Sequence, residues 1–221
     1  MSSNSIRRSQ QALQSVLDLV FPPQCASCKQ YGSVLCSSCF ASMLPSTLLP
    51  PRHDGHSIHS IYAVNTYQGT LRTCIHALKY EGMTRLAEPL GTLLTRLYLS
   101  YHVGANLLIP VPLHPERQKQ RGYNHAELLA QICATHTGVP STPHLLTRTR
   151  ATLAQVGLTA EQRQQNMVNA FRVSATQAIA GRRIVIVDDV CTTGATLEAC
   201  ASVLLRAGAV SVDALVLARP V

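Results

Sequence analysis

Tryptophan is absent from this sequence, and aromatic and charged residues are both scarce. Aromatic residues make up 5% of the 221 residues, and charged residues make up 14%. This composition is globular and excludes the class of chains that stay disordered through an excess of charge. No run of about 18 uninterrupted apolar residues occurs, because Arg96 breaks the best candidate. The sequence therefore predicts no membrane span.

A cleavable signal is also missing from the first 20 residues, because polar residues interrupt their apolar stretch. The remaining apolar residues follow helical spacing, which predicts an amphipathic helix within residues 1–20: Leu13, Val16, Leu17 and Val20. Packing of this helix on the body of the protein is favoured over a membrane-surface anchor, which Arg7 and Arg8 would also suit. We expect a cytoplasmic protein.

The charge is unbalanced toward the basic side. Lys and Arg number 19 against 11 acids, which gives a formal net charge of +8. Part of the excess gathers in residues 110–172, which hold seven basic and three acidic residues. Such a bias favours anionic partners electrostatically, but a solvated basic surface is an equally good interpretation of the charge alone.

Four of the eight cysteines lie close together near the front of the chain. They form two C-x2-C pairs, CASC and CSSC, with seven residues between the pairs: Cys25, Cys28, Cys36 and Cys39. Two such pairs can surround one ion with four thiolates, which is a typical structural zinc site with no open position for catalysis. Disulfides are the alternative, but a reducing compartment disfavours them. The sequence therefore predicts a zinc-ribbon segment and linker over residues 21–50, followed by one domain over residues 51–221.

Strand and helix patterns alternate through that domain. Predicted strands cover 60–64, 106–113, 182–190 and 210–220, and predicted helices cover 70–80, 84–99, 125–136 and 195–208. This alternation predicts an α/β fold, with a mostly parallel sheet flanked by helices. Ligands of such sheets bind beyond the carboxyl ends of the strands. Two stretches arrive there, PVPLHPERQKQRGYN and DDVCTTGAT.

The second stretch, within IVIVDDVCTTGAT, combines a buried strand with polar chemistry. Asp188 and Asp189 end the strand, and two carboxylates there need hydroxyls, cations or solvent to satisfy them. Thr192, Thr193, Gly194 and Thr196 follow just where a helix begins, and free amides at a helix start bind phosphate. A phosphorylated sugar satisfies both halves. A capped helix with acidic decoration, or a Mg²⁺ carboxylate pair unrelated to sugars, remains as the alternative.

VIVDDVCTTGAT resembles the phosphoribosyl pyrophosphate (PRPP) binding motif of type I phosphoribosyltransferases. Further blocks narrow the resemblance to the ComF family, including its GntX-like members: the front cysteines, HALKYEG (76–82), PVPLHPERQKQRGYNHAELLA (110–130) and RTRATLAQVGLTAEQRQQNMVNAF (148–171). The blocks occur in order and cover nearly all of the chain after residue 21. The resemblance implies a type I phosphoribosyltransferase-like fold with a small N-terminal zinc ribbon.

The resemblance also implies roles for individual residues. Asp188 and Asp189 would contact the ribose hydroxyls of PRPP. The 5-phosphate would be surrounded by Thr192, Thr193, Gly194, Ala195 and Thr196. Catalytic roles would fall to Arg117 and Arg121, which would neutralise the pyrophosphate beside Mg²⁺, and to a lid that carries Arg148, Arg150, Thr152, Gln155 and Arg163. No role can be predicted for Lys79, Tyr80, His114 or His125.

Two functions follow from this resemblance. The first is a Mg²⁺-dependent enzyme that transfers phosphoribosyl from PRPP to an acceptor, linked to DNA uptake or natural transformation. The second is a non-catalytic competence factor that retains PRPP binding and binds single-stranded DNA or a helicase-like partner. The basic charge suits DNA, but no convincing interleaving of aromatic and basic residues accompanies it. Nothing in the sequence predicts the acceptor or an oligomeric state.

Overall fold

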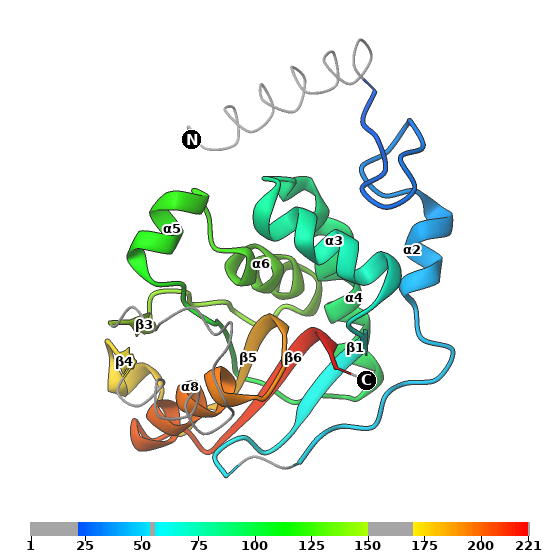
Figure 1. The fold of residues 1–221 in the computed structure, drawn as a ribbon. Coiled ribbons are helices and arrows are strands. Elements are labelled where there is room, and N and C mark those ends of the chain that lie inside the picture. Colours follow the sequence, from blue (N-terminus) through cyan, green and yellow to red (C-terminus); the bar gives the residue numbers. More distant parts are fainter. Residues whose placement is uncertain (1–21, 54–55, 150–169, 221) are drawn as a thin grey trace.

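A computed structural model of the chain describes residues 22–53, 56–149 and 170–220. Its centre is a parallel sheet of four strands (Figure 1). The strands lie in the order β1 (Ile61–Thr66), β6 (Ser211–Arg219), β5 (Arg183–Val190) and β2 (Leu107–Pro110). The parallel α/β fold that the sequence predicts is confirmed.

Helices cover both faces of this sheet. One face carries α3 (Gly69–Tyr80), α4 (Ala87–Ser100) and α6 (His125–Thr137), with the 3-10 turn η1 (Thr84–Leu86) leading into α4 (Figure 1). The other face carries α8 (Ala195–Arg206) and a two-stranded antiparallel hairpin, β3 (Leu146–Arg148) and β4 (Phe171–Val173). The 3-10 turn η2 (Thr176–Ala178) leads from β4 toward β5. A sheet covered in this way needs strands that are apolar on both faces, which explains the continuous Val and Ile run of β5.

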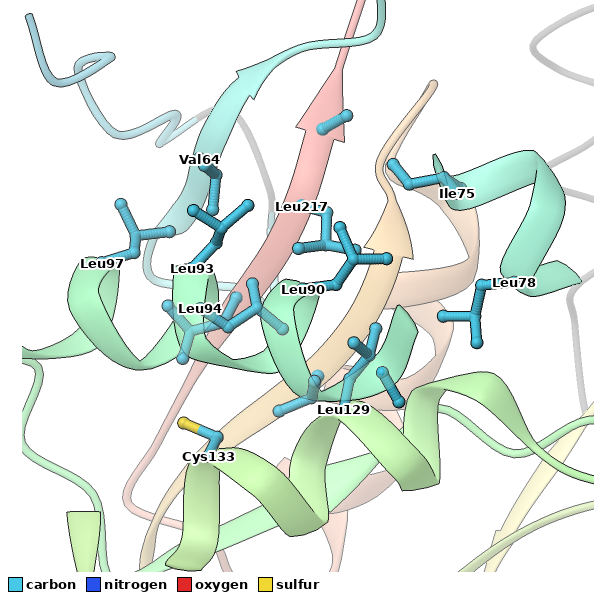
Figure 2. Close-up of a cluster of buried hydrophobic side chains, with 14 of the residues drawn as sticks. Val64, Ile75, Leu78, Leu90, Leu93, Leu94, Leu97, Leu129, Cys133 and Leu217 are labelled. Atoms are coloured by element: carbon cyan, nitrogen blue, oxygen red, sulfur yellow. The ribbon is translucent and has the colours of Figure 1, made fainter. Parts of the chain in front are cut away.

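The core beneath α4 is built from leucines at helical spacing (Figure 2). Leu90, Leu93, Leu94 and Leu97 are each at most 3% exposed, and they face the sheet together with Leu129 of α6. Full burial of one such side chain contributes about 1.5–3 kcal/mol relative to exposure. The packing of α4 on α6 is close, because a Cβ atom at Gly91 would lie 2.6 Å from the Cβ atom of Ile132. These contacts fix the helices that deliver side chains to the sheet's carboxyl end.

Strand β5 sends alternate side chains to opposite faces of the sheet. Val185 and Val187 belong to the apolar cluster on the α3, α4 and α6 side, whereas Ile184 and Ile186 belong to the cluster on the α8 side. This period of two is the geometry of any β-strand. By the same alternation, Asp189 continues the first row and Asp188 continues the second.

The outer strands of the sheet are partly covered by short bridges. At β1, Arg52 and Ile61 exchange backbone hydrogen bonds. At β2, the Leu108 N–H donates to the Pro140 carbonyl, and the Leu108 carbonyl accepts from the Thr142 N–H. The last residue of β2, Pro110, has no backbone N–H to offer.

Four features of the described residues were not predicted. They are α2 (Ser37–Met43) in the cysteine segment, α5 (Pro115–Arg121), the β3–β4 hairpin and the 3-10 turn η2. All are short, and α5 is polar throughout with no buried residue. The helix predicted within residues 1–20 lies outside the described residues. None of the helices in the described part of the chain has the length and hydropathy needed to cross a bilayer.

Candidate functional site

The acid pair at the carboxyl end of β5 is held by the backbone that follows it. One oxygen of Asp188, Oδ1, accepts a hydrogen bond from the Asp189 N–H at 2.9 Å. Oδ1 of Asp189 accepts one from the Val190 N–H at 2.7 Å. The Asp189 side chain is 4% exposed and that of Asp188 is 14% exposed. Both carboxylates are therefore preorganised at a site that is largely shielded from water.

Two basic side chains from the neighbouring helices meet the second oxygen of Asp189. Lys79, at the end of α3, places Nζ 2.6 Å from Asp189 Oδ2. His125, the first residue of α6, places Nε2 3.3 Å from the same oxygen and 3.8 Å from Asp188 Oδ1. Asn124 sets the position of His125, because its side chain accepts from the Ala126 N–H at the helix start and donates to the Val111 carbonyl.

The two acids have opposite pKa directions. Burial opposes the ionisation of Asp189, but His125 and Lys79 outweigh it and hold the pKa of Asp189 below its usual range. Burial likewise opposes the charge on Lys79, but Asp189 and then Asp188 raise the pKa of Lys79 above its usual value. For Asp188, burial and then the charge of Asp189 raise the pKa to about 6. Asp189 is thus the firmly ionised member of the pair.

A chain of polar contacts connects the acid pair to the loop after β2. The Arg121 guanidinium lies 2.7 Å from His125 Nδ1, and because arginine can only donate, Nδ1 is the acceptor. With Nδ1 as the acceptor, the ring N–H of His125 is on Nε2, toward Asp189. Arg121 also lies over the ring of Tyr80, 5.3 Å from its centroid. Lys79, Tyr80 and His125, whose roles the sequence left open, therefore surround Asp189 and Arg121.

The loop from Cys191 to Gly194 lies between β5 and α8. Gly194 has a φ of +81°, in the left-handed region that glycine adopts without strain, and α8 begins at the next residue. The Thr193 hydroxyl accepts from the Ala195 N–H at 3.4 Å, and both Thr192 and Thr193 are exposed. The amides and hydroxyls of this loop, at the start of a helix of 12 residues, suit an anionic oxygen group.

The remaining arginines of the predicted site are spread around it. Arg117 is exposed on α5. Arg148, on β3, lies over the Phe171 ring at 5.5 Å, and burial followed by the charge of Arg117 lowers the pKa of Arg148. His114 lies 3.7 Å from the Glu116 carboxylate, and no contact places it with the acid pair. Four lid residues fall outside the described residues: Arg150, Thr152, Gln155 and Arg163.

A second cluster lies in the N-terminal segment, where the four predicted cysteines meet. The sulfurs of Cys25, Cys28, Cys36 and Cys39 all lie within 4.8 Å of one another, and the Cys28 and Cys36 sulfurs are 3.6 Å apart. Zinc–sulfur bonds of about 2.3 Å in a tetrahedron place sulfurs about 3.8 Å apart. The cluster therefore has the ligand set and the size that zinc requires.

The thiols of this cluster do not ionise equally on their own. The Ser38 hydroxyl, which lies 3.2 Å from the Cys36 sulfur, lowers the pKa of Cys36 to about 6. Its thiolate neighbour Cys36 raises the pKa of Cys39 to about 12. Four thiolates this close repel one another, so a cation is needed to stabilise all four together.

His125, Asp188 and Asp189 are also close enough to share a cation, since their ligand atoms lie within 4.8 Å of one another. However, Lys79 Nζ already lies 2.6 Å from Asp189 Oδ2. A metal ion there would meet the ammonium charge of Lys79. We therefore assign no metal ion to this group of residues.

Comparison with known proteins gives the family. The model of a family described as "Phosphoribosyl transferase domain" matches residues 125–220. The "DNA utilization protein YhgH" of Salmonella typhimurium is 33% identical over 202 residues, which are 89% of this chain and 83% of that protein. "Competence protein F" of Haemophilus influenzae is 39% identical over 113 residues, 51% of this chain and 49% of the relative. "Competence protein ComFC" of Bacillus subtilis is 28% identical over 162 residues, 71% of this chain and 63% of the relative. The chain therefore belongs to the ComF family of proteins with a phosphoribosyltransferase domain.

Proposed function

We propose that this chain binds PRPP and, with Mg²⁺, transfers its phosphoribosyl group to an acceptor that is not yet identified. One observation carries the proposal most directly. The acid pair ends β5 immediately before a loop whose amides and hydroxyls surround the start of α8. The acid pair offers carboxylate oxygens that accept hydrogen bonds from sugar hydroxyls, and the loop donates to a phosphate. Membership in the ComF family supports the same donor.

The basic residues around the acid pair suit the pyrophosphate of PRPP. Arg121 and Arg117 lie on α5, which follows β2 at the carboxyl end of the sheet. Both can donate to phosphate oxygens, and Arg121 is already oriented by His125. Mg²⁺ would be carried mainly by the phosphate oxygens of the substrate, where it neutralises charge on the leaving group. Arg148 would reach the donor from β3, on the α8 side.

In the reaction, the bond between C1 of the ribose and the pyrophosphate oxygen breaks, and the acceptor forms a new bond to C1. Both bonding electrons leave with pyrophosphate, so positive charge develops on the ribose and negative charge on the leaving group. The carboxylates face the first and the arginines face the second. The contribution of the protein is therefore positioning and electrostatic stabilisation, rather than a covalent intermediate.

The cysteine cluster would hold a structural zinc ion. Four sulfur ligands fill a tetrahedral shell and leave no position for a substrate, so this metal would stabilise the segment over residues 21–50. The phosphoribosyltransferase domain would then extend over residues 51–221. The names of the relatives refer to competence and DNA utilization. We place this chain in the same cellular context, with single-stranded DNA or a helicase-like protein as partners to test.

The donor site is tested by thermal unfolding with PRPP and Mg²⁺. A ligand at 100 times its Kd stabilises a protein by about 2.7 kcal/mol, which raises the Tm of a domain of this size by roughly 5–10 °C. Asp188→Asn should remove the rise. Glu88→Gln is the matched control, since Glu88 is an exposed carboxylate on α4 that contacts His136. Absence of any rise in the wild-type protein would refute PRPP binding.

Transfer itself is tested by pyrophosphate release. Bases, amines and single-stranded nucleic acid are supplied in turn as acceptors, with PRPP and Mg²⁺ present. An acceptor that accelerates release in the wild-type protein, but not in Asp188→Asn, identifies the reaction. Binding of PRPP without acceptor-dependent release would instead support a non-catalytic PRPP-binding factor.

A further inference from the structure

The two adjacent acids do not have equivalent surroundings. Asp189 continues the row of Val185 and Val187, so its side chain lies on the face covered by α3 and α6. Asp188 continues the row of Ile184 and Ile186, on the face where α8 and the loop before it lie. A sugar whose phosphate is bound by that loop approaches from the side of Asp188. Asp188 and Asp189 are adjacent on β5, but their side chains therefore lie on opposite faces of the sheet, in different environments.

The Asp189 carboxylate is already paired with basic groups of the protein. Its Oδ1 accepts from Val190, and its Oδ2 faces both Lys79 at 2.6 Å and His125 at 3.3 Å. The contacts of Asp188 are fewer and weaker. Its Oδ1 accepts from Asp189, and His125 is 3.8 Å away. A ligand hydroxyl that bonded to Asp189 would have to compete with an ion pair, whereas one that bonded to Asp188 would not.

We propose that the pair is divided: Asp188 binds the ribose hydroxyls, and Asp189 is a positioning residue that Lys79 and His125 hold in place from the opposite face of the sheet. The inference rests on the proposed function, because it concerns the same donor site. Lys79 thereby has a defined task. The positive charge of Lys79 balances the negative charge of Asp189. The Asp189 carboxylate can therefore be buried next to that of Asp188.

The position of Lys79 favours a fixed ion pair over a lysine that moves to the substrate. Helix α3 is anchored next to it, because the Tyr123 hydroxyl donates to the Leu78 carbonyl, and Leu78 and Ile75 are buried in the core under α3 (Figure 2). Only 20% of the Lys79 side chain is exposed. Removing one partner from such a pair leaves an uncompensated buried charge, so the ion pair resists opening.

The test is a double-mutant cycle on the full-length protein, with PRPP and Mg²⁺ binding measured by calorimetry. Lys79→Met removes the ammonium partner of the Asp189 carboxylate, and Asp189→Asn removes the nearest carboxylate partner of the Lys79 ammonium. Each single change should weaken PRPP binding by about tenfold or more. The double variant removes both charges, and the amide that replaces the Asp189 carboxylate can still accept a hydrogen bond from His125. It should bind PRPP within about threefold of wild type.

Three results would overturn the inference. If Asp189 contacts ribose, the double variant binds no better than Asp189→Asn. If Lys79 contacts PRPP, the double variant binds no better than Lys79→Met. Lys79→Met that binds like wild type would show that the ion pair is dispensable. Where a single variant fails to fold, the double variant alone tests the proposal. A folded double variant that does not bind PRPP refutes it. Wild-type protein that does not bind PRPP would instead refute the proposed function itself.

Discussion

Asp188→Asn should stabilise the ligand-free protein at neutral pH. Burial and the neighbouring charge of Asp189 raise the pKa of Asp188 from 3.8 to about 6. That difference is about two pKa units, each worth about 1.4 kcal/mol, so the ionised carboxylate costs the folded state about 3 kcal/mol. Asparagine carries no charge, and its side-chain oxygen can still accept from the Asp189 N–H. Asp188, which is proposed to bind the substrate, would thus lower the stability of the folded protein when no substrate is bound.

The sign of the pH dependence follows from the raised pKa. Protonated Asp188 favours the folded state, so this contribution is fully present below pH 3.8 and is lost as the pH rises through about 6. The variant should therefore exceed wild type in its free energy of unfolding by roughly 1–2 kcal/mol at pH 5 and by roughly 3 kcal/mol at pH 7.5. Asp189, whose pKa is lowered, stays ionised throughout this interval.

Urea unfolding at pH 5 and pH 7.5, with zinc present and thiols reduced, measures the free energy of unfolding of the variant and of wild type at each pH. Only the difference between the variant and wild type is interpreted, because the zinc-binding thiols and the histidines away from the acid pair contribute equally to both. Glu116→Gln is the control, since that carboxylate is 78% exposed and should give no difference at either pH. A variant that is less stable than wild type at pH 7.5, or a difference that does not change with pH, would refute the reasoning.

Two further predictions concern the rest of the structure. Zinc analysis of the purified protein should give about one ion per chain, and Cys28→Ser should lower that content and raise amide hydrogen exchange in the cysteine segment; full zinc content in the variant would contradict the four-sulfur site. Gly91→Ala should lower the free energy of unfolding by about 1–3 kcal/mol, because the added Cβ would lie 2.6 Å from that of Ile132. Ile132→Ala removes the two γ carbons that would lie 2.7 and 3.2 Å from the new Cβ, so Gly91→Ala should cost less in that background than in wild type, as measured by urea unfolding. A neutral Gly91→Ala would show that α4 and α6 separate without cost.

Sequence periodicity predicted the elements that build the sheet because their burial is nearly complete. The run IVIV before the acid pair can only be a strand buried on both faces, and β5 extends over Arg183–Val190. In the same way, leucines at helical spacing predicted a helix over residues 84–99, and α4 covers Ala87–Ser100. Its first turn differs, since residues Thr84–Leu86 form a 3-10 turn.

Elements with little burial gave no such signal. Helix α5 contains no buried residue, so no apolar stripe marks it, although Pro115 at its start is a usual first helical residue. Strands β3 and β4 are three residues each, which is too short for a period to emerge. Pairing across the β3–β4 hairpin joins Leu146 to Val173, far apart in sequence, and no local pattern encodes that distance.

The surroundings of the acid pair could be predicted only in part. The motif around Asp188 and Asp189 is local, and so the strand, loop and helix order was readable from the sequence. The ion pair between Lys79 and Asp189 joins residues from α3 and β5, which come together only when the chain folds. A lysine at the end of a helix is ordinarily a solvated residue near the helix dipole, and nothing local distinguishes Lys79 from that case. Only the tertiary structure shows that Lys79 pairs with Asp189.

The outer edge of β2 limits how other chains can attach to this protein. Leu108 already uses both of its outward backbone groups in hydrogen bonds to Pro140 and Thr142, and Pro110 has no N–H. An extended peptide, or the same strand of another copy, thus finds no donor at these two positions with which to continue the sheet. Partners that approach this side must be recognised by side chains, and the edge is also protected from the strand-to-strand association that begins aggregation.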